Sequence, residues 1–208
     1  MTTEERLECF KTELNFIKHS GLRRFAELLL ENADEYFFTV PASSSGKYHP
    51  DFARKVGGLV LHTKAVVDIA HMIVEEQSLW GLDDLQKDIL FVSAIAHDIK
   101  KQGNGAGKHT IKEHPMCAAT YVMDVFTAYS EELQNNGVSQ AIAQKIGEII
   151  VSHMGKWAVK DGMPAPTTKG QLLLCTADYM ASRKEWCQTF AGEPDVIQKM
   201  LLTESLTN

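Results

Sequence analysis

Four segments of the sequence place a histidine or an aspartate where an apolar residue is expected. His62 is followed by apolar residues at the helical offsets 3, 4, 7 and 11, and His153 is preceded by isoleucines at the same offsets. Asp178 closes the apolar run LLLCTA, and His97 and Asp98 close the run ILFVSAIA. A buried carboxylate is costly without a counter-charge or a metal. Imidazole nitrogens and carboxylate oxygens that converge from several helices are typical ligands of a divalent transition metal.

Each of these positions also has a structural explanation when it is taken alone. A single histidine on an apolar face is usually a hydrogen-bonded core residue, and a single buried aspartate often caps a helix or pairs with an arginine. Four separate segments that each bring such a residue to an apolar stripe favour one shared site over four unrelated structural roles.

The elements that must position these residues are predicted to be helices. Apolar residues recur at helical spacing over most of the chain, and no stretch shows the alternation of a half-buried strand. The expected helices cover the first 40 residues with an interruption near Gly21, then 59–74, 89–96 with its flanks, 115–129, 139–153 and 169–186. Segments 41–50 and 161–168 are rich in turn-forming residues and are expected to be loops. The sequence therefore predicts an all-α fold.

The composition is that of a globular domain. The chain has 208 residues, of which 44% are hydrophobic and 23% are charged, and this excludes a disordered, collagen-like or disulfide-dense protein. Its net charge of −6 argues against a globally basic nucleic-acid binder.

Other features of the sequence bear on its location. No apolar run approaches the ~20 residues that span a bilayer, and the first ten residues lack the layout of a signal peptide. Cys9, Cys117, Cys175 and Cys187 form no CxxC pair, which is consistent with reduced thiols. We therefore expect a cytoplasmic protein with no membrane partner.

Five ordered motifs make this sequence resemble the HD superfamily of metal-dependent phosphohydrolases. The motifs are GGLVLHT (57–63), AIAHDIKK (94–101), EHP (113–115), SHMGKW (152–157) and TADYMASRK (176–184). The resemblance covers roughly residues 41–186 and implies a single HD-type helical domain over 41–190. Residues 1–40 are then expected to be N-terminal helices packed on that domain, and 191–208 a C-terminal tail or helix.

The resemblance implies a set of metal ligands. By the family pattern, the first cation is held by His62, His97, Asp98 and Asp178. His114 and His153 match the positions that hold a second cation in some relatives, with Asp98 bridging the two ions. The sequence departs from that dinuclear pattern at Met154, since many such relatives have two adjacent histidines there. One or two divalent ions are therefore expected, with Mn, Fe, Ni, Co and Mg all open.

The resemblance also suggests residues that act on the substrate. Lys101 matches the lysine of the HDxxK element, where its cation would face a phosphate or a leaving group; a solvated lysine at a helix end is the alternative. Further candidates for substrate contact lie before GGLVLHT, or a few residues after His153 or Asp178. Two of them also have a structural explanation: Trp157 could be a core residue, and Arg183 could form a surface ion pair. These candidates are Lys47, Tyr48, His49, Lys156, Trp157, Arg183 and Lys184.

The function implied is hydrolysis of a phosphoester, as a phosphomonoesterase or a phosphodiesterase, on a nucleotide or a short oligonucleotide. The sequences of the motifs are most similar to those in the HD domain of bacterial 3′–5′ exoribonucleases and in its stand-alone relatives from bacteria or phages. The sequence has no β-rich segment to supply their additional nucleic-acid-binding domain, which favours short substrates. Two alternatives remain: a non-catalytic nucleotide-binding HD module, and a cyclic-dinucleotide phosphodiesterase, although the GYP element of the latter is missing. The amphipathic stretch 14–30 would also permit a homodimer.

Overall fold

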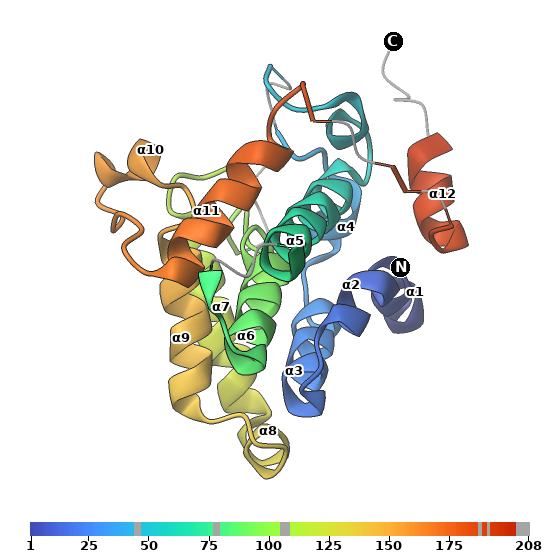
Figure 1. Cartoon of the computed structure of the whole chain (residues 1–208). Helices are drawn as coiled ribbons and strands as arrows, with labels where there is room; N and C mark the ends of the chain where they lie inside the picture. Colours follow the sequence, from blue (N-terminus) through green and yellow to red (C-terminus); the bar gives the residue numbers. More distant parts are fainter. Residues whose placement is uncertain (44–46, 77–79, 105–108, 187–188, 191, 203–208) are drawn as a thin grey trace.

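The computed structural model describes residues 1–43, 47–76, 80–104, 109–186, 189–190 and 192–202. All the regular structure in these ranges is helical, as the sequence predicts, and none of the described residues forms a strand (Figure 1). The first helices along the chain are α1 (Thr3–Cys9), α2 (Lys11–Phe16), α3 (Ser20–Glu31), α4 (Glu35–Thr39) and the short 3-10 helix η1 (Asp51–Arg54). The remaining helices are α5 (Gly58–Glu76), α6 (Asp84–Ala96), α7 (His114–Ala128), α8 (Ser130–Asn135), α9 (Gln140–Val151), α10 (Lys156–Val159), α11 (Lys169–Ala181) and α12 (Asp195–Leu202).

Five helices form the centre of the molecule. α5 packs against α6 and α11, while α9 packs against α6, α7 and α11. Their apolar faces form one continuous core, to which α1–α4 also contribute large side chains such as Phe10, Phe25 and Phe37. α6 is largely enclosed, since every residue from Asp88 to Ala96 is buried. The apolar run at 89–96 is therefore a buried helix, as expected.

The N-terminal helices are interrupted at Phe10, at residues 17–19 and at residues 32–34, and the second of these breaks is the one expected near Gly21. The backbone N–H groups of Lys18 and His19 donate to the two carboxylate oxygens of Asp88 on α6, at 3.0 and 2.7 Å, and this separates α2 from α3. Gly21 lies in the first turn of α3, where a Cβ atom would stand 2.1 Å from the carbonyl oxygen of Asn136. This glycine allows a close approach between segments and does not break the helix.

The last predicted central helix is shorter than the sequence suggested. α11 begins at Lys169 behind a capping box formed by Thr168 and Gln171. It ends at Ala181 and not at Trp186, because Arg183 N–H bonds the carbonyl of Met180 in a tighter turn. The predicted loops agree with the structure: described residues 41–43 and 47–50 form no helix, and neither do 161–168.

The first and last described helices lie next to each other. α12 contacts α1, and the Lys55 ammonium bonds the carbonyl of Leu201. Among the described residues, no helix combines the length and the apolar character that crossing a bilayer requires. Cys9, Cys117 and Cys175 are free thiols, while Cys187 lies outside the described residues.

Candidate metal centre

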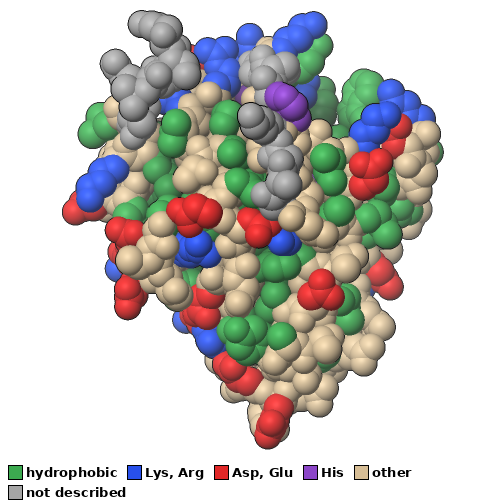
Figure 2. Space-filling model, turned by 180° about the vertical axis from the view of Figure 1, so that it is seen from behind, with side chains coloured by type: hydrophobic (Ala, Val, Ile, Leu, Met, Phe, Trp, Pro, Cys, Tyr) green, Lys and Arg blue, Asp and Glu red, His purple; other side chains and the backbone are tan. Residues whose placement is uncertain are grey.

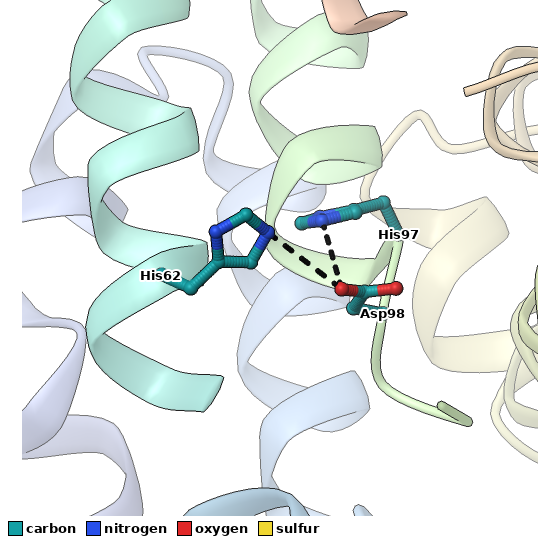
Figure 3. Close-up of side chains that lie close together, drawn as sticks. All are labelled: His62, His97 and Asp98. Carbon is teal, nitrogen blue, oxygen red and sulfur yellow. Dashed lines mark ion pairs between the residues drawn. The ribbon is translucent and has the colours of Figure 1, made fainter. Parts of the chain in front are cut away.

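Three of the predicted ligands meet where α6 ends. The helix stops at Ala96, and successive tight turns then carry His97 and Asp98 inward, so that both side chains are buried. His62 reaches the same place from the second turn of α5. Figure 3 shows the two imidazole rings turned toward the Asp98 carboxylate. Asp98 Oδ2 lies 3.7 Å from Nε2 of His62 and 3.4 Å from Nε2 of His97.

Asp178 on α11 adjoins this group. Its Oδ1 atom lies 3.1 Å from Nε2 of His62 and 3.9 Å from Nε2 of His97. Its side chain is 16% exposed, whereas the two histidines are fully enclosed. Asp178 is therefore the most exposed of the six predicted ligands.

A second group lies on the other side of Asp98. His114 is the first residue of α7, where Pro115 favours the helix start, and His153 follows the end of α9. Asp98 Oδ1 is 3.1 Å from Nε2 of His114 and 3.7 Å from Nε2 of His153. The two Nε2 atoms are 3.2 Å apart. Asp98 thus presents one oxygen to each pair of histidines.

Backbone carbonyl groups orient three of the four rings. Nδ1 lies 2.7 Å from the Ala94 oxygen in His97, 2.7 Å from the Ile111 oxygen in His114 and 2.8 Å from the Ile150 oxygen in His153. A ring that donates its Nδ1 proton to a carbonyl keeps Nε2 free of protons. This is the arrangement by which proteins fix histidine ligands of a metal.

The two carboxyl groups of the site, Asp98 and Asp178, are held in their charged form by neighbouring cations and rings. Burial opposes ionisation of this carboxyl, but the Lys101 ammonium and the His97 ring hold its pKa well below the ordinary value. Lys101 Nζ donates to Asp98 Oδ2, so this lysine is not a solvated residue at a helix end. Burial likewise opposes ionisation of Asp178, and His62 and His97 lower its pKa. Both carboxylates are therefore anionic near neutral pH.

The pKa values of buried histidines at this site shift in opposite directions. Desolvation lowers the pKa of His62, and that of His153 falls to about 3. Burial also acts against a charged His97, but the carboxylates of Asp98 and Asp178 outweigh it and raise its pKa.

The residues present fit one or two divalent cations. His62 Nδ1 and Nε2, His97 Nε2 and Asp98 Oδ1 are buried and have no hydrogen-bond partner among the described residues. Two compact groups of ligand atoms share Asp98: one with His62 and His97, the other with His114 and His153. Buried polar atoms of this kind require partners, and nitrogen and oxygen donors suit Mn, Fe, Co, Ni or Zn better than Ca.

These groups lie at the wall of a cavity of about 760 Å³, within the usual range for small-molecule sites. Asp98, Asp178, His114 and His153 reach it, together with Lys101. Among the predicted contact residues, the cavity is lined by Tyr48, His49, Lys156, Trp157 and Arg183. Lys47 and Lys184 are exposed and are not among its lining residues, so the structure gives no support to a substrate contact by either.

Several of the lining side chains are exposed and pair with one another instead of packing in the core. Trp157 is 61% exposed, and Lys156 Nζ lies 5.0 Å from its ring centroid. The Arg183 guanidinium lies 5.4 Å from the Tyr48 ring and 4.5 Å from that of Tyr179, and no described carboxylate pairs with it. Trp157 is thus not a core residue, and Arg183 forms no ion pair with a carboxylate in the part of the chain that the structure describes.

His49 faces the first ligand group. Its ring centroid lies 5.4 Å from that of His62 in an edge-on arrangement. Burial, followed by repulsion from His62 and Lys101, lowers the pKa of His49 to about 3. This ring is therefore neutral in the metal-free protein.

Sequence reasoning missed several residues that line the cavity. Tyr179 directly follows Asp178 and is four residues before Arg183, so the helical spacing within TADYMASRK was a usable signal. Thr110 and Pro166 come from loops far away in the sequence, and no local pattern marks them.

The surface charge is uneven. In Figure 2 the Lys and Arg side chains gather along the upper end of the molecule, the end at which α10 and α11 lie in Figure 1, whereas acidic side chains are scattered below. A locally basic end on a chain of net charge −6 favours an anionic ligand there.

Comparisons with known proteins agree with this geometry. A family model described as the HD domain matches residues 59–183, which is more than half of the chain and a range that contains the six predicted ligands. Searches among curated proteins and among solved structures gave no match. The narrower similarity to exoribonuclease HD domains stays a prediction. The chain belongs to the HD superfamily of metal-dependent phosphohydrolases.

Proposed function

We propose that this protein hydrolyses a phosphoester of a nucleotide or a short oligonucleotide with the help of divalent cations. One observation carries the proposal: the two oxygens of Asp98 face two separate pairs of buried histidines at the wall of an open cavity. A structural role for five buried polar groups would leave their unpartnered atoms unexplained.

The ligand groups divide the site into two parts. His62, His97 and Asp98, with Asp178 beside them, would hold one cation, and Asp98, His114 and His153 would hold another. A divalent cation supplies Lewis-acid polarisation of a phosphoryl oxygen and lowers the pKa of a water molecule. The overall reaction adds one water across a phosphorus–oxygen bond: the water oxygen bonds to phosphorus, the ester bond breaks, and the departing oxygen takes a proton.

Lys101 has a separate task in this proposal. Its ammonium contacts Asp98 and also lines the cavity. A cation in that place offsets the negative charge that develops on the phosphoryl oxygens or on the leaving group.

The nucleotide part of the proposal depends on the cavity walls. Trp157, Tyr48 and Tyr179 expose aromatic rings, and Lys156 and Arg183 place cations beside them. A base stacks on an aromatic ring, while a phosphate binds a guanidinium or an ammonium.

The first experiment measures metal content and activity together. Protein reconstituted with Mn²⁺, Fe²⁺ or Ni²⁺ and then desalted is expected to retain about two ions per chain when both ligand groups are occupied. Hydrolysis of bis(p-nitrophenyl) phosphate, p-nitrophenyl phosphate and a panel of nucleotides follows on the same samples. Asp98→Asn is expected to abolish metal retention and turnover while the helical circular dichroism is preserved.

Asp84→Asn is the matched control, since Asp84 is an exposed residue of α6 that pairs only with Lys18 among the described residues. It is expected to leave metal content and turnover unchanged. Retained activity in Asp98→Asn would overturn the proposal. Metal-loaded protein that binds nucleotides but hydrolyses none of these substrates would point to a non-catalytic module.

A further inference from the structure

One face of α11 runs along the cavity and gives it two ends. Cys175 and Tyr179 lie one turn apart on this face, and Arg183 follows them in the turn after the helix; all three line the cavity as a row. From Cys175 to the end of the helix at Ala181 the rise is about 9 Å. Asp178, which lies beside the histidine ligands, is between the two ends of this row.

Each end of the row meets a different loop. At the Cys175 end, Gly155 packs so closely that a Cβ atom there would be 2.7 Å from the Cys175 sulfur. Gly155 has a φ of 57°, a conformation that glycine adopts without strain, and the chain continues directly into Lys156 and Trp157. At the other end, Tyr48 from the loop before α5 contacts Arg183.

Both ends therefore carry an exposed aromatic ring beside a cation. Trp157 is 61% exposed next to Lys156, and Tyr48 is 53% exposed next to Arg183. The Nε atom of Arg183 is buried without a hydrogen-bond partner among the described residues, so it lacks an acceptor there. Each of these aromatic–cation pairs is sufficient to bind one base, so the two pairs on either side of the ligand groups provide places for two bases.

We infer that the cavity binds a linear phosphodiester with a nucleobase on each side of the scissile phosphate, one base on Trp157 and the other on Tyr48. This inference rests on the proposed function and narrows its substrate. Since stacked neighbouring bases are only about 3.4 Å apart, bases that reach both ends of a row of about 9 Å are splayed away from each other. Splayed bases on aromatic side chains are typical of single-stranded recognition. Hydrolysis of such a ligand adds one water and yields a phosphomonoester and a free hydroxyl end.

A binding experiment tests this without requiring turnover. Two thymidine ligands of equal charge are titrated by calorimetry with a chelator present: linear dithymidine monophosphate, and the methyl ester of thymidine 5′-monophosphate. Both contain one phosphodiester, but only the first has two bases. The dinucleotide is expected to bind about tenfold more tightly, the gain of one stacked base.

Two variants locate the bases. Trp157→Ala and Tyr48→Ala are each expected to weaken dinucleotide binding about tenfold, while the methyl ester loses affinity in only one of them. Leu85→Ala, at a 42% exposed residue of α6 outside the cavity, is the matched control and should bind both ligands like the parent protein. Since Trp157 and Tyr48 are both largely exposed, these variants should fold normally, which circular dichroism checks.

The outcomes separate this inference from the proposed function. Equal affinity for the two ligands, no measurable dinucleotide binding, or unchanged binding in both variants would overturn the two-ended site even if bis(p-nitrophenyl) phosphate is hydrolysed. If the two-ended pattern is found but no substrate is hydrolysed with any metal, the site stands and the hydrolase proposal fails.

Discussion

The ion cluster around Lys64 is expected to be essential for stability, and Lys64→Met tests it. Lys64 lies on α5, the helix that also carries His62, and its side chain is fully buried. Its ammonium lies 2.6 Å from each carboxylate oxygen of Glu13, which is also fully buried, and 3.2 Å from Glu193. The carbonyl of Cys9 accepts a further bond at 3.0 Å. Methionine preserves the bulk of the side chain but leaves Glu13 without its cation.

The expected loss in the free energy of unfolding follows from the unpaired charge that the variant leaves on buried Glu13. Removing one partner of a buried pair costs about 3–5 kcal/mol, because the other charge stays buried without compensation. With a urea dependence of about 2 kcal/mol per molar, the unfolding midpoint should fall by about 1.5–2.5 M. Burial already raises the pKa of Glu13, and Lys64 is the main group that lowers it. In the variant this carboxyl therefore binds its proton more tightly when folded than when unfolded, so stability is lost as the pH rises.

Urea unfolding at pH 5 and pH 8, followed by circular dichroism, measures both effects. The loss of stability should be larger at pH 8 than at pH 5. Lys18→Met is the matched control, because the Lys18–Asp84 pair is exposed and should give no measurable shift. The double variant Glu13→Leu with Lys64→Met should regain part of the stability. A midpoint shift below about 0.5 M at pH 8, or equal losses at both pH values, would refute this reasoning.

Three further predictions concern the candidate metal centre. His114→Ala should lower the tightly held metal from about two ions to about one per chain, measured by elemental analysis; an unchanged content would contradict the second ligand group. Lys101→Met should tighten metal binding in chelator competition, because its ammonium competes for Asp98 Oδ2, while turnover falls about 100-fold, or ~2.7 kcal/mol in the barrier. Weaker metal binding would argue against that competition. The metal-free protein should lose stability as the pH falls from 6.5 toward about 3, since folding keeps His49 and His153 neutral while the unfolded chain binds protons. A melting temperature that is constant between pH 7.5 and pH 5 would contradict this.

Much of the helical framework could be predicted from local sequence. Apolar residues at a period of 3.6 define α5, α6, α7 and α9 because each helix buries one stripe or more against its neighbours. A polar residue within such a stripe is visible without a structure, and this is how His62, His153 and Asp178 were recognised as candidates. The order of the motifs then indicated the family.

Local sequence failed where a distant segment decides the outcome. The break before α3 depends on Asp88, about 70 residues away, and Gly21 serves a contact with Asn136. Of the neighbours Arg183 and Lys184, only the first lines the cavity, because the turn after α11 directs it toward Tyr48 and Tyr179. Their residue types alone could not separate them.

The sequence by itself determined the helical class, the family and the residues able to hold a metal, because periodicity and residue chemistry are local properties. Only the tertiary structure decided which oxygen of Asp98 faces each pair of histidines, which Lys and Arg side chains line the cavity, and that Lys64 is enclosed with Glu13 and Glu193. These contacts join residues that are 51 and 129 positions apart in the case of Lys64. Such contacts depend on how helices pack, since packing brings together side chains that no spacing along one helix relates.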